Sequence, residues 1–325
     1  MATSVPFCLS SCTPQTRLLS KPKSHVQCPP MSLLSSPQIG QSKSLIPLSL
    51  THNINGVFSP LGKNRNRNMV GVVKASMDNK NLEVFSKEHL AMSLAKHVAH
   101  ISKQFINDRG YFTLVLSGGS VKYLRKLVEA PYIDSIPWSK WHIFWVDEKV
   151  VPKTHVESNY KLAYDGFISK VKIPAVNVYT IDDALPAEGV ADVYETTLRR
   201  LVASKIIASS DYSLPKFDLM LLDMGPDGQV GALFPNHPVL KETKKWVAYV
   251  KDAPKPPPER ITFTLPVINS ASNIAMVVTG AGKADAVYTT IQNDQSVPKI
   301  PVQMVSPEGD LKWFLDKGAA SKLYK

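Results

Sequence analysis

The stretch FDLMLLDMGPDGQVGALFP, residues 217–235, indicates the class of fold most clearly. Its first six residues form a short, nearly continuous apolar run, which is typical of a strand that is buried on both faces. The run ends in Asp-Met-Gly-Pro-Asp-Gly, where glycine, proline and aspartate make a continued strand or helix improbable. Ligands of α/β sheets bind beyond the carboxyl ends of such strands. Residues 223–228 are therefore predicted to be either a binding loop or an ordinary strand-to-helix turn.

Strands and helices are predicted to alternate through residues 80–325. Apolar runs indicate strands at residues 81–85, 111–116, 141–146, 177–181, 217–222, 246–250, 274–279, 302–305 and 311–315. Intervening stretches indicate helices that end near residues 107, 129, 167, 207 and 291; Ser86 can cap the first of these helices and Gly110 can end it. The alternation predicts a doubly wound, mostly parallel α/β sheet with helices on both faces, Rossmann-like and in one domain.

The first 75 residues have the composition of a disordered organelle transit peptide, with residues 76–325 as the folded domain. Residues 1–77 contain eight Lys or Arg and no Asp or Glu, so that +8 of the net charge of +11 lies there and +3 remains for residues 78–325. A nearly neutral domain argues against a nucleic-acid partner. No apolar stretch approaches the length of a membrane helix. The three cysteines, Cys8, Cys12 and Cys28, all lie in the leader, so the folded domain contains none.

Several polar segments follow predicted strands and could carry chemistry. Ser117-Gly118-Gly119-Ser120 joins a strand to a helix and has the form of a phosphate cradle, or of a tight turn. Asp147, Glu148 and Lys149 end the third strand on the same sheet edge, and a loop with Asn159 follows them. Arg260 and Lys283 add cations at turns. Nucleotide-binding glycine motifs are absent, and the histidines show no metal-ligand spacing, so we expect no metal.

Taken together, these loops resemble the 6-phosphogluconolactonase family of plant type, within the superfamily that also holds glucosamine-6-phosphate isomerases. The matching stretches are LVLSGGS, WHIFWVDEKVVP, HVESNYKLAY, FDLMLLDMGPDGQVGALFP, PPERITFTLPVIN and VVTGAGKADAV. The resemblance implies hydrolysis of 6-phospho-D-glucono-1,5-lactone to 6-phosphogluconate without a cofactor. It implies a phosphate held by residues 117–120 with Lys149 and Lys283, and further substrate contacts from Asp147, Glu148, Asn159 and Arg260. It also places the reaction at the Asp227-Gly228-Gln229 turn.

The chain departs from the family pattern at the position of the proposed general base. Gln229 stands where the family has histidine, and Lys149 stands where it usually has arginine. A glutamine amide cannot take a proton near neutral pH, although it can orient a water molecule or donate a hydrogen bond. Either another group serves as the base, with Asp227, Glu148 and His155 as candidates, or the chain is an impaired paralogue that binds a phosphosugar or a protein partner. Sugar-phosphate isomerisation is a third possibility.

The leader composition favours a plastid location, and Met77 could start a cytosolic form. Ser321-Lys322-Leu323 spells a peroxisomal address, but two residues follow it, so we expect that signal to be silent. We expect a monomer that acts on a phosphorylated sugar lactone and binds neither nucleic acid nor membrane.

Overall fold

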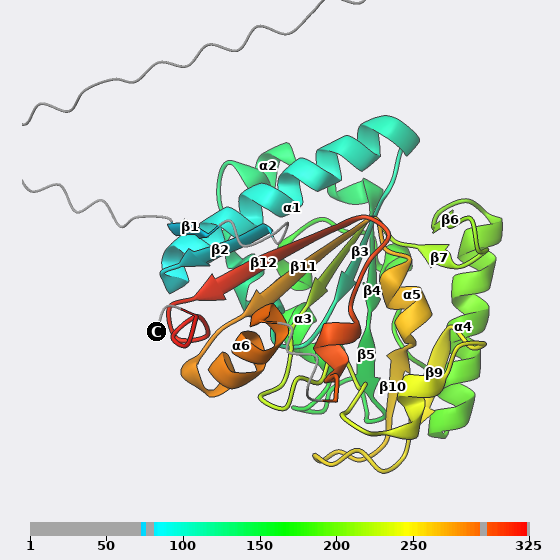
Figure 1. The fold of residues 1–325 in the computed structure, drawn as a ribbon. Coiled ribbons are helices and arrows are strands. Elements are labelled where there is room, and N and C mark those ends of the chain that lie inside the picture. Colours follow the sequence, from blue (N-terminus) through cyan, green and yellow to red (C-terminus); the bar gives the residue numbers. More distant parts are fainter. Residues whose placement is uncertain (1–72, 76–80, 293–297, 324–325) are drawn as a thin grey trace, which may run out of the picture. The chain divides into compact units, whose positions relative to one another are not determined.

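Short apolar runs form the centre of the protein, as the sequence predicts. The computed structural model describes residues 73–75, 81–292 and 298–323 (Figure 1). The central sheet has the order β1-β2-β12-β11-β8-β3-β4, and its neighbouring strands are parallel except β1 and β2. In that order the strands are Val73–Ala75, Asn81–Phe85, Asp310–Asp316, Asn273–Val278, Leu219–Leu222, Phe112–Leu116 and Trp141–Trp145. The predicted mostly parallel α/β sheet is confirmed.

Side chains of the central strands alternate between two apolar cores, one on each face of the sheet. On one face, Leu114 and Leu116 of β3 pack in the same core as α1 (Lys87–Arg109) and the 3₁₀ helix η1 (Val121–Val128). Val115 of β3 points into the other core. Helices α4 (Ala187–Ala203), α5 (Leu265–Asn269) and α6 (Ala284–Gln292) contribute to that second core. Because both faces are covered, the strands read as continuous apolar runs rather than as alternating ones.

Local capping residues set the ends of α1, as the sequence predicts. Ser86 is its N-cap and accepts a hydrogen bond from the backbone N–H of His89. Gly110 ends it in the left-handed conformation, with φ of 86°, and donates to the carbonyl of Ile106. A glycine adopts this conformation without the steric penalty of a side chain.

A second, antiparallel sheet stands beside the central one and was not predicted. It consists of β5 (Asp147–Lys149), β10 (Arg260–Phe263) and β9 (Val247–Val250), in that order. Its register pairs Lys149 with Arg260 and Asp147 with Thr262. The pairing therefore brings two segments that are about one hundred residues apart in the chain to the same edge of the molecule (Figure 1). A two-stranded ribbon, β6 (Ala208–Ser209) with β7 (Pro215–Lys216), lies between α4 and β8 in the sequence.

Two strand predictions are wrong. Residues 177–181 form no strand; η4 (Ala175–Asn177) occupies the start of this segment, and Val178 pairs with Ile143 only through an isolated bridge. Residues 302–305 belong largely to η7 (Pro301–Met304), where Pro301 takes the first helical position, for which its fixed φ is suited. Apolar residues are needed equally by a short helix and by a strand that faces a core, so the composition of such short runs does not separate the two.

The remaining short helices connect these elements at the surface of the sheet. They are α2 (Tyr132–Ser135), η2 (Trp138–Lys140), α3 (Asn159–Gly166), η3 (Ile168–Lys170), η5 (Pro238–Lys241) and η6 (Ala281–Lys283). The predicted helix after residue 120 is the 3₁₀ helix η1, and α4 ends at Ala203, earlier than predicted. No helix in the described part of the chain has the length and apolar character that crossing a bilayer requires.

The predicted leader lies largely outside the described residues. Its last three residues, Val73–Ala75, form β1, which pairs antiparallel with β2 at the edge of the central sheet. The sequence assigns these three residues to the leader, and in the structure they pair with the edge strand of the domain. The domain boundary at residues 75 and 76 remains a prediction.

Chain connections change direction between β3 and β8. The connection that leaves β3 leads outward to β4, whereas the one that leaves β8 leads to β11 on the other side. Adjacent parallel strands with diverging connections leave a crevice at their carboxyl ends, and α/β proteins bind ligands there. The crevice lies between the loop of residues 117–120 and the loop of residues 223–228.

Candidate active site

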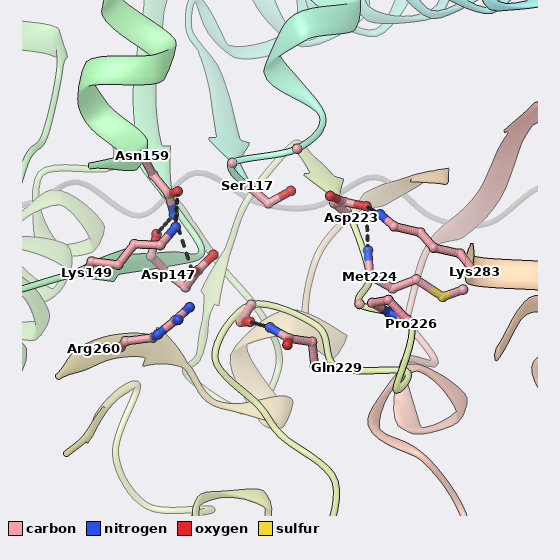
Figure 2. Close-up of a pocket in the computed structure, with 14 residues that line it drawn as sticks. Ser117, Asp147, Lys149, Asn159, Asp223, Met224, Pro226, Gln229, Arg260 and Lys283 are labelled. Atoms are coloured by element: carbon pink, nitrogen blue, oxygen red, sulfur yellow. Dashed lines mark hydrogen bonds and ion pairs between the residues drawn. The ribbon is translucent and has the colours of Figure 1, made fainter. Parts of the chain in front are cut away.

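A cavity of about 240 Å³ opens at this carboxyl edge. Of the residues singled out from the sequence, those that line it are Ser117, Gly118, Gly119, Asp147, Lys149, Asn159, Gln229, Arg260 and Lys283. In Figure 2, Asp147, Lys149 and Asn159 form one wall, Asp223 and Lys283 lie on another, and Gln229 faces them from the side opposite Ser117. Segments from both sheets therefore converge on one site, as the resemblance implies.

The serine-glycine loop after β3 combines unpaired backbone donors with a firm anchor. In the described part of the chain, the N–H groups of Gly118 and Gly119 donate to no protein acceptor. The Ser117 hydroxyl donates to the carbonyl oxygen of Leu221 at 3.0 Å, and the Ser117 N–H donates to the same oxygen at 3.2 Å. These bonds fix the loop to the end of β8. Free N–H groups beside a cavity suit an anion.

Ser120 does not line the cavity. It is fully buried, and its hydroxyl donates to the carbonyl of Ser117 at 3.0 Å. The structure therefore places Ser120 behind the loop, where it stabilises the turn, rather than at the predicted phosphate contact.

Close contacts explain why both glycines in this loop lack a side chain. A Cβ atom on Gly119 would lie 1.7 Å from Oδ2 of Asp223, and one on Gly118 would lie 2.6 Å from Oδ1 of Asn159. Both distances are far below van der Waals contact, so any larger residue would force the opposite wall to move. The side chains of Asp223 and Asn159 therefore pack directly against the glycine loop.

The acidic strand end presents alternate side chains to the cavity. Because β5 is a strand, Asp147 and Lys149 point to one side and Glu148 to the other. Lys149 Nζ donates to Oδ1 of Asn159 at 2.5 Å, and the Asn159 amide donates to the Asp147 carbonyl at 2.8 Å and to Asp147 Oδ2 at 3.3 Å. Asn159 therefore connects the two charged residues and fixes their positions.

Glu148 does not line the cavity, in contrast to its predicted role. It is 2% exposed and accepts hydrogen bonds from the backbone N–H groups of Asn159 and Tyr160, both at 2.7 Å, at the start of α3. Burial raises the pKa of the Glu148 carboxyl to about 7, although these backbone N–H groups lower it. Its oxygens are engaged in holding α3, so Glu148 is not placed to act as the base.

Gln229 is held by a neighbouring lysine that the sequence analysis did not identify. Its Nε2 donates to the carbonyl of Gly231 at 3.0 Å, and its Oε1 accepts from Lys255 Nζ at 2.6 Å. The same ammonium lies 3.2 Å from Oδ2 of Asp227, whose Oδ1 accepts the backbone N–H of Gln229 at 3.3 Å. Asp227, Gln229 and Lys255 thus form one connected group at the cavity.

Asp227 and Gly228 stand just behind the cavity lining. A Cβ atom on Gly225, which does line the cavity, would lie 2.3 Å from Asp227 Oδ1. Gly228 adopts φ of 80° and packs against Ile300. A glycine is needed there because the left-handed conformation and the nearby Ile300 side chain both disfavour a Cβ atom.

Arg260 positions the proline-rich loop that carries Lys255. It is 5% exposed, its guanidinium lies 5.5 Å from the centre of the Phe234 ring, and it donates to the carbonyls of Lys255, Pro256 and Pro257. Nη1 of Arg260 has no protein acceptor among the described residues. This arginine therefore fixes the loop, while it still presents one donor group at the cavity.

Lys283 forms an ion pair with Asp223, a residue that the sequence analysis treated only as part of a turn. Lys283 Nζ lies 2.5 Å from Oδ1 of Asp223, and both side chains are partly buried, with exposures of 20% and 24%. Asp223 follows β8 directly, a place where α/β proteins put functional residues. Its place directly after a predicted strand could have identified Asp223 as a site residue from the sequence.

None of the histidines in the described residues lines the cavity. His155 is exposed and accepts the N–H of Glu157. His142 is buried against Tyr179, and burial lowers the pKa of its imidazole to about 4. Within the described residues, no three His, Cys, Asp or Glu side chains are grouped as a metal site would require.

Comparisons with known proteins agree on one family. The family described as glucosamine-6-phosphate isomerases/6-phosphogluconolactonase matches residues 86–313. A protein of Oryza sativa subsp. indica named probable 6-phosphogluconolactonase 4, chloroplastic, is 59% identical over 242 residues, which cover 73% of this chain and 75% of the relative. The 6-phosphogluconolactonase 3, chloroplastic, of Arabidopsis thaliana is 56% identical over 249 residues, 76% of each chain.

A solved structure shares the fold. The 6-phosphogluconolactonase of Trypanosoma brucei superposes with a TM-score of 0.66 at 25% identity, covering 75% of this chain and 99% of that one.

Proposed function

The chain belongs to the glucosamine-6-phosphate isomerase/6-phosphogluconolactonase family, and from this premise we propose that it hydrolyses 6-phospho-D-glucono-1,5-lactone to 6-phospho-D-gluconate in the oxidative pentose phosphate pathway. Relatives with 56–59% identity bear the name of this activity. The observation that carries the proposal is the cavity, where a glycine loop with free N–H groups meets three cationic side chains, Lys149, Arg260 and Lys283. The reaction needs only water as a second reactant.

The phosphate group binds at the glycine loop. The N–H groups of Gly118 and Gly119 donate to its oxygens, and the Lys283 and Lys149 ammonium groups balance a charge of about −1.5 to −2. Asp147 and Asn159 lie on the adjacent wall and accept or donate hydrogen bonds to the hydroxyl groups of the sugar ring. This arrangement directs the lactone carbonyl toward Gln229 and Arg260.

Water attacks the lactone carbonyl, and the ring ester bond then breaks. Attack places negative charge on the carbonyl oxygen, which requires hydrogen-bond donors. The second N–H of the Gln229 amide and the Nη1 group of Arg260 supply them. The ring oxygen leaves as the C5 hydroxyl after it receives a proton, which gives an acyclic carboxylic acid.

We take Asp227 as the base because its carboxylate contacts both Gln229 and Lys255 just behind the cavity lining, whereas the Glu148 carboxylate holds the start of α3. A carboxylate can take the proton of the attacking water, with Lys255 beside it to balance its charge. Because a carboxylate is a weaker base than the imidazole that the family pattern has at residue 229, the reaction proceeds at a reduced rate.

The same observation favours a second candidate function. Gln229 cannot accept a proton, and a site without a working base would still bind a phosphorylated sugar. In that case the chain is a binding protein that arose from the enzyme family. Hydrolysis and binding must therefore be measured separately.

Location and assembly follow from the relatives and the sequence. Several similar plant proteins are named chloroplastic, which supports a plastid location for this chain. A cytosolic form that starts at Met77 would lack β1, because β1 comprises Val73–Ala75. We propose that the protein acts as a monomer.

Restoring the imidazole tests this assignment. The assay is the opening of freshly prepared 6-phosphogluconolactone by the full chain, corrected for spontaneous hydrolysis. It compares the wild type with Gln229→His and with the control Gln292→His, at an exposed residue of α6. The wild type is expected to exceed the spontaneous rate, and Gln229→His to raise kcat by up to about 100-fold, the lower end of what a positioned base contributes.

Two results would count against the proposal. A wild-type rate equal to the spontaneous rate, with 6-phosphogluconate still bound, supports the binding protein instead. If Gln229→His raises kcat no more than Gln292→His does, the missing imidazole at residue 229 does not limit the rate.

A further inference from the structure

We propose that Asp223 is a specificity-determining residue, whose carboxylate borders the anion subsite and holds Lys283 until a phosphate displaces it. This inference rests on the proposed function, because it concerns the subsite that would hold the substrate phosphate. Asp223 lies directly after β8 and lines the cavity. Its carboxylate therefore competes with any anionic ligand for Lys283.

The position of the carboxylate coincides with the glycine loop. A Cβ atom on Gly119 would lie only 1.7 Å from Oδ2 of Asp223 and 2.7 Å from its Cγ. This oxygen therefore lies against the Cα of Gly119, in the loop whose N–H groups are free to bind an anion. Two negatively charged groups cannot share this space without repulsion.

Lys283 is unavailable while this contact persists. Its ammonium lies 2.5 Å from Asp223 Oδ1, and Oδ1 also accepts the backbone N–H of Met224 at 2.7 Å. The Met224 contact holds the carboxylate in its rotamer, and the pair is about three-quarters buried. Figure 2 shows the two side chains pointing toward each other.

The charge balance gives the direction of the effect. Three cationic side chains line the cavity against two carboxylates, those of Asp147 and Asp223. The Asp147 carboxylate accepts from Asn159 on the far wall, so Asp223 is the carboxylate next to the glycine loop. Removing its charge raises the positive potential at the loop and releases Lys283. Affinity for phosphate groups should therefore increase.

The test compares Asp223→Asn with the wild type in the full chain, by calorimetric titration with inorganic phosphate, 6-phosphogluconate and unphosphorylated gluconate. Asparagine keeps the size of the side chain and an oxygen for the Met224 N–H. We expect about tenfold tighter binding of phosphate and 6-phosphogluconate at low salt, as one removed like charge predicts for a partly exposed site. Gluconate should change by less than about twofold, and added salt should reduce the gain.

Two further variants serve as controls. Asp192→Asn removes the same charge from an exposed lysine pair outside the cavity, with Lys245 at 3.2 Å, and should leave phosphate binding unchanged. Asp223→Glu keeps the charge and should give no gain, which tests the idea even if asparagine disturbs folding. All variants are first compared by thermal unfolding.

Unchanged or weaker phosphate binding in Asp223→Asn would overturn the inference, because Asp223 would then be a ligand-binding or merely structural residue. An equal gain in Asp192→Asn or in Asp223→Glu would overturn it as well. The proposed function fails independently: if the wild type does not hydrolyse the lactone while Asp223→Asn still binds phosphate more tightly, the inference stands and the enzymatic assignment does not.

Discussion

Replacing Arg260 tests how the site is supported, because this buried side chain fixes the loop that carries Lys255. Arg260→Met keeps an apolar side chain over Phe234 but removes the donors to three loop carbonyls, at 2.9, 3.1 and 3.4 Å. A hydrogen bond from a charged group contributes about 1.5–3 kcal/mol, and the two shorter bonds are well formed. The loop residues 254–256 and 258 are exposed, so water can replace part of this loss.

We therefore expect Arg260→Met to lower the free energy of unfolding by about 2–4 kcal/mol, measured by urea denaturation. Arg200→Met on exposed α4 is the matched control and should change it by less than about 0.5 kcal/mol. In the lactone assay, kcat should also fall, because the proposed oxyanion donor Nη1 is lost and Lys255 loses the support that aligns it with Gln229. An unfolding free energy of Arg260→Met within about 0.5 kcal/mol of the wild type would refute this reasoning.

Two other substitutions probe the neighbouring groups. Burial raises the pKa of Glu148 from 4.5 to about 7. Between these pH values the folded state therefore binds more protons than the unfolded state, and the free energy of unfolding of the wild type falls as pH rises, by up to roughly 3 kcal/mol. Glu148→Gln should lose this slope in urea denaturation series at several pH values, and parallel curves for the two proteins would contradict it. Lys255→Met should lower kcat by about threefold to tenfold with KM and melting temperature little changed, since its pair with Asp227 is half-exposed. Lys251→Met, a similarly exposed lysine paired with Glu188, is the control, and an equal loss there would argue against a specific role for Lys255.

Much of the fold follows from local patterns in the sequence. Strands that are buried on both faces need apolar residues throughout, so runs such as residues 217–222 were recognisable without their partners. The cap at Ser86 and the stop at Gly110 are set by neighbouring residues alone. The antiparallel sheet β5-β10-β9 was missed because it pairs Lys149 with Arg260, about one hundred residues apart in the chain. The residues near either one in the sequence do not indicate that pairing.

The site was partly predictable for the same reason. Loops that follow parallel strands must meet at one edge, which brought the serine-glycine loop, Lys149 and Gln229 together around one cavity. The prediction that Glu148 lies in the cavity was wrong, although the sequence could have excluded it. Neighbouring residues in a strand face opposite sides, so Glu148 cannot line the same cavity as Asp147 and Lys149.

Asp223 and Lys255 were missed for different physical reasons. Aspartate is common in turns, and the special position of Asp223 depends on its contact with Gly119, about one hundred residues away in the chain. Lys255 stands in the proline-rich segment PKPPP, residues 254–258, where no neighbouring residue marks it as part of a site. Its direction is set by Arg260, whose hydrogen bonds to the loop are visible only in three dimensions.

The central claim is that this site hydrolyses a phosphorylated lactone with Asp227 in place of the missing imidazole. Its most direct test is the initial rate of 6-phosphogluconolactone opening by the full chain and by Asp227→Asn, followed by NMR with the spontaneous rate subtracted. The account predicts turnover by the wild type and a loss of at least about 100-fold in kcat for Asp227→Asn, with 6-phosphogluconate still bound. Equal rates for the two proteins would contradict it.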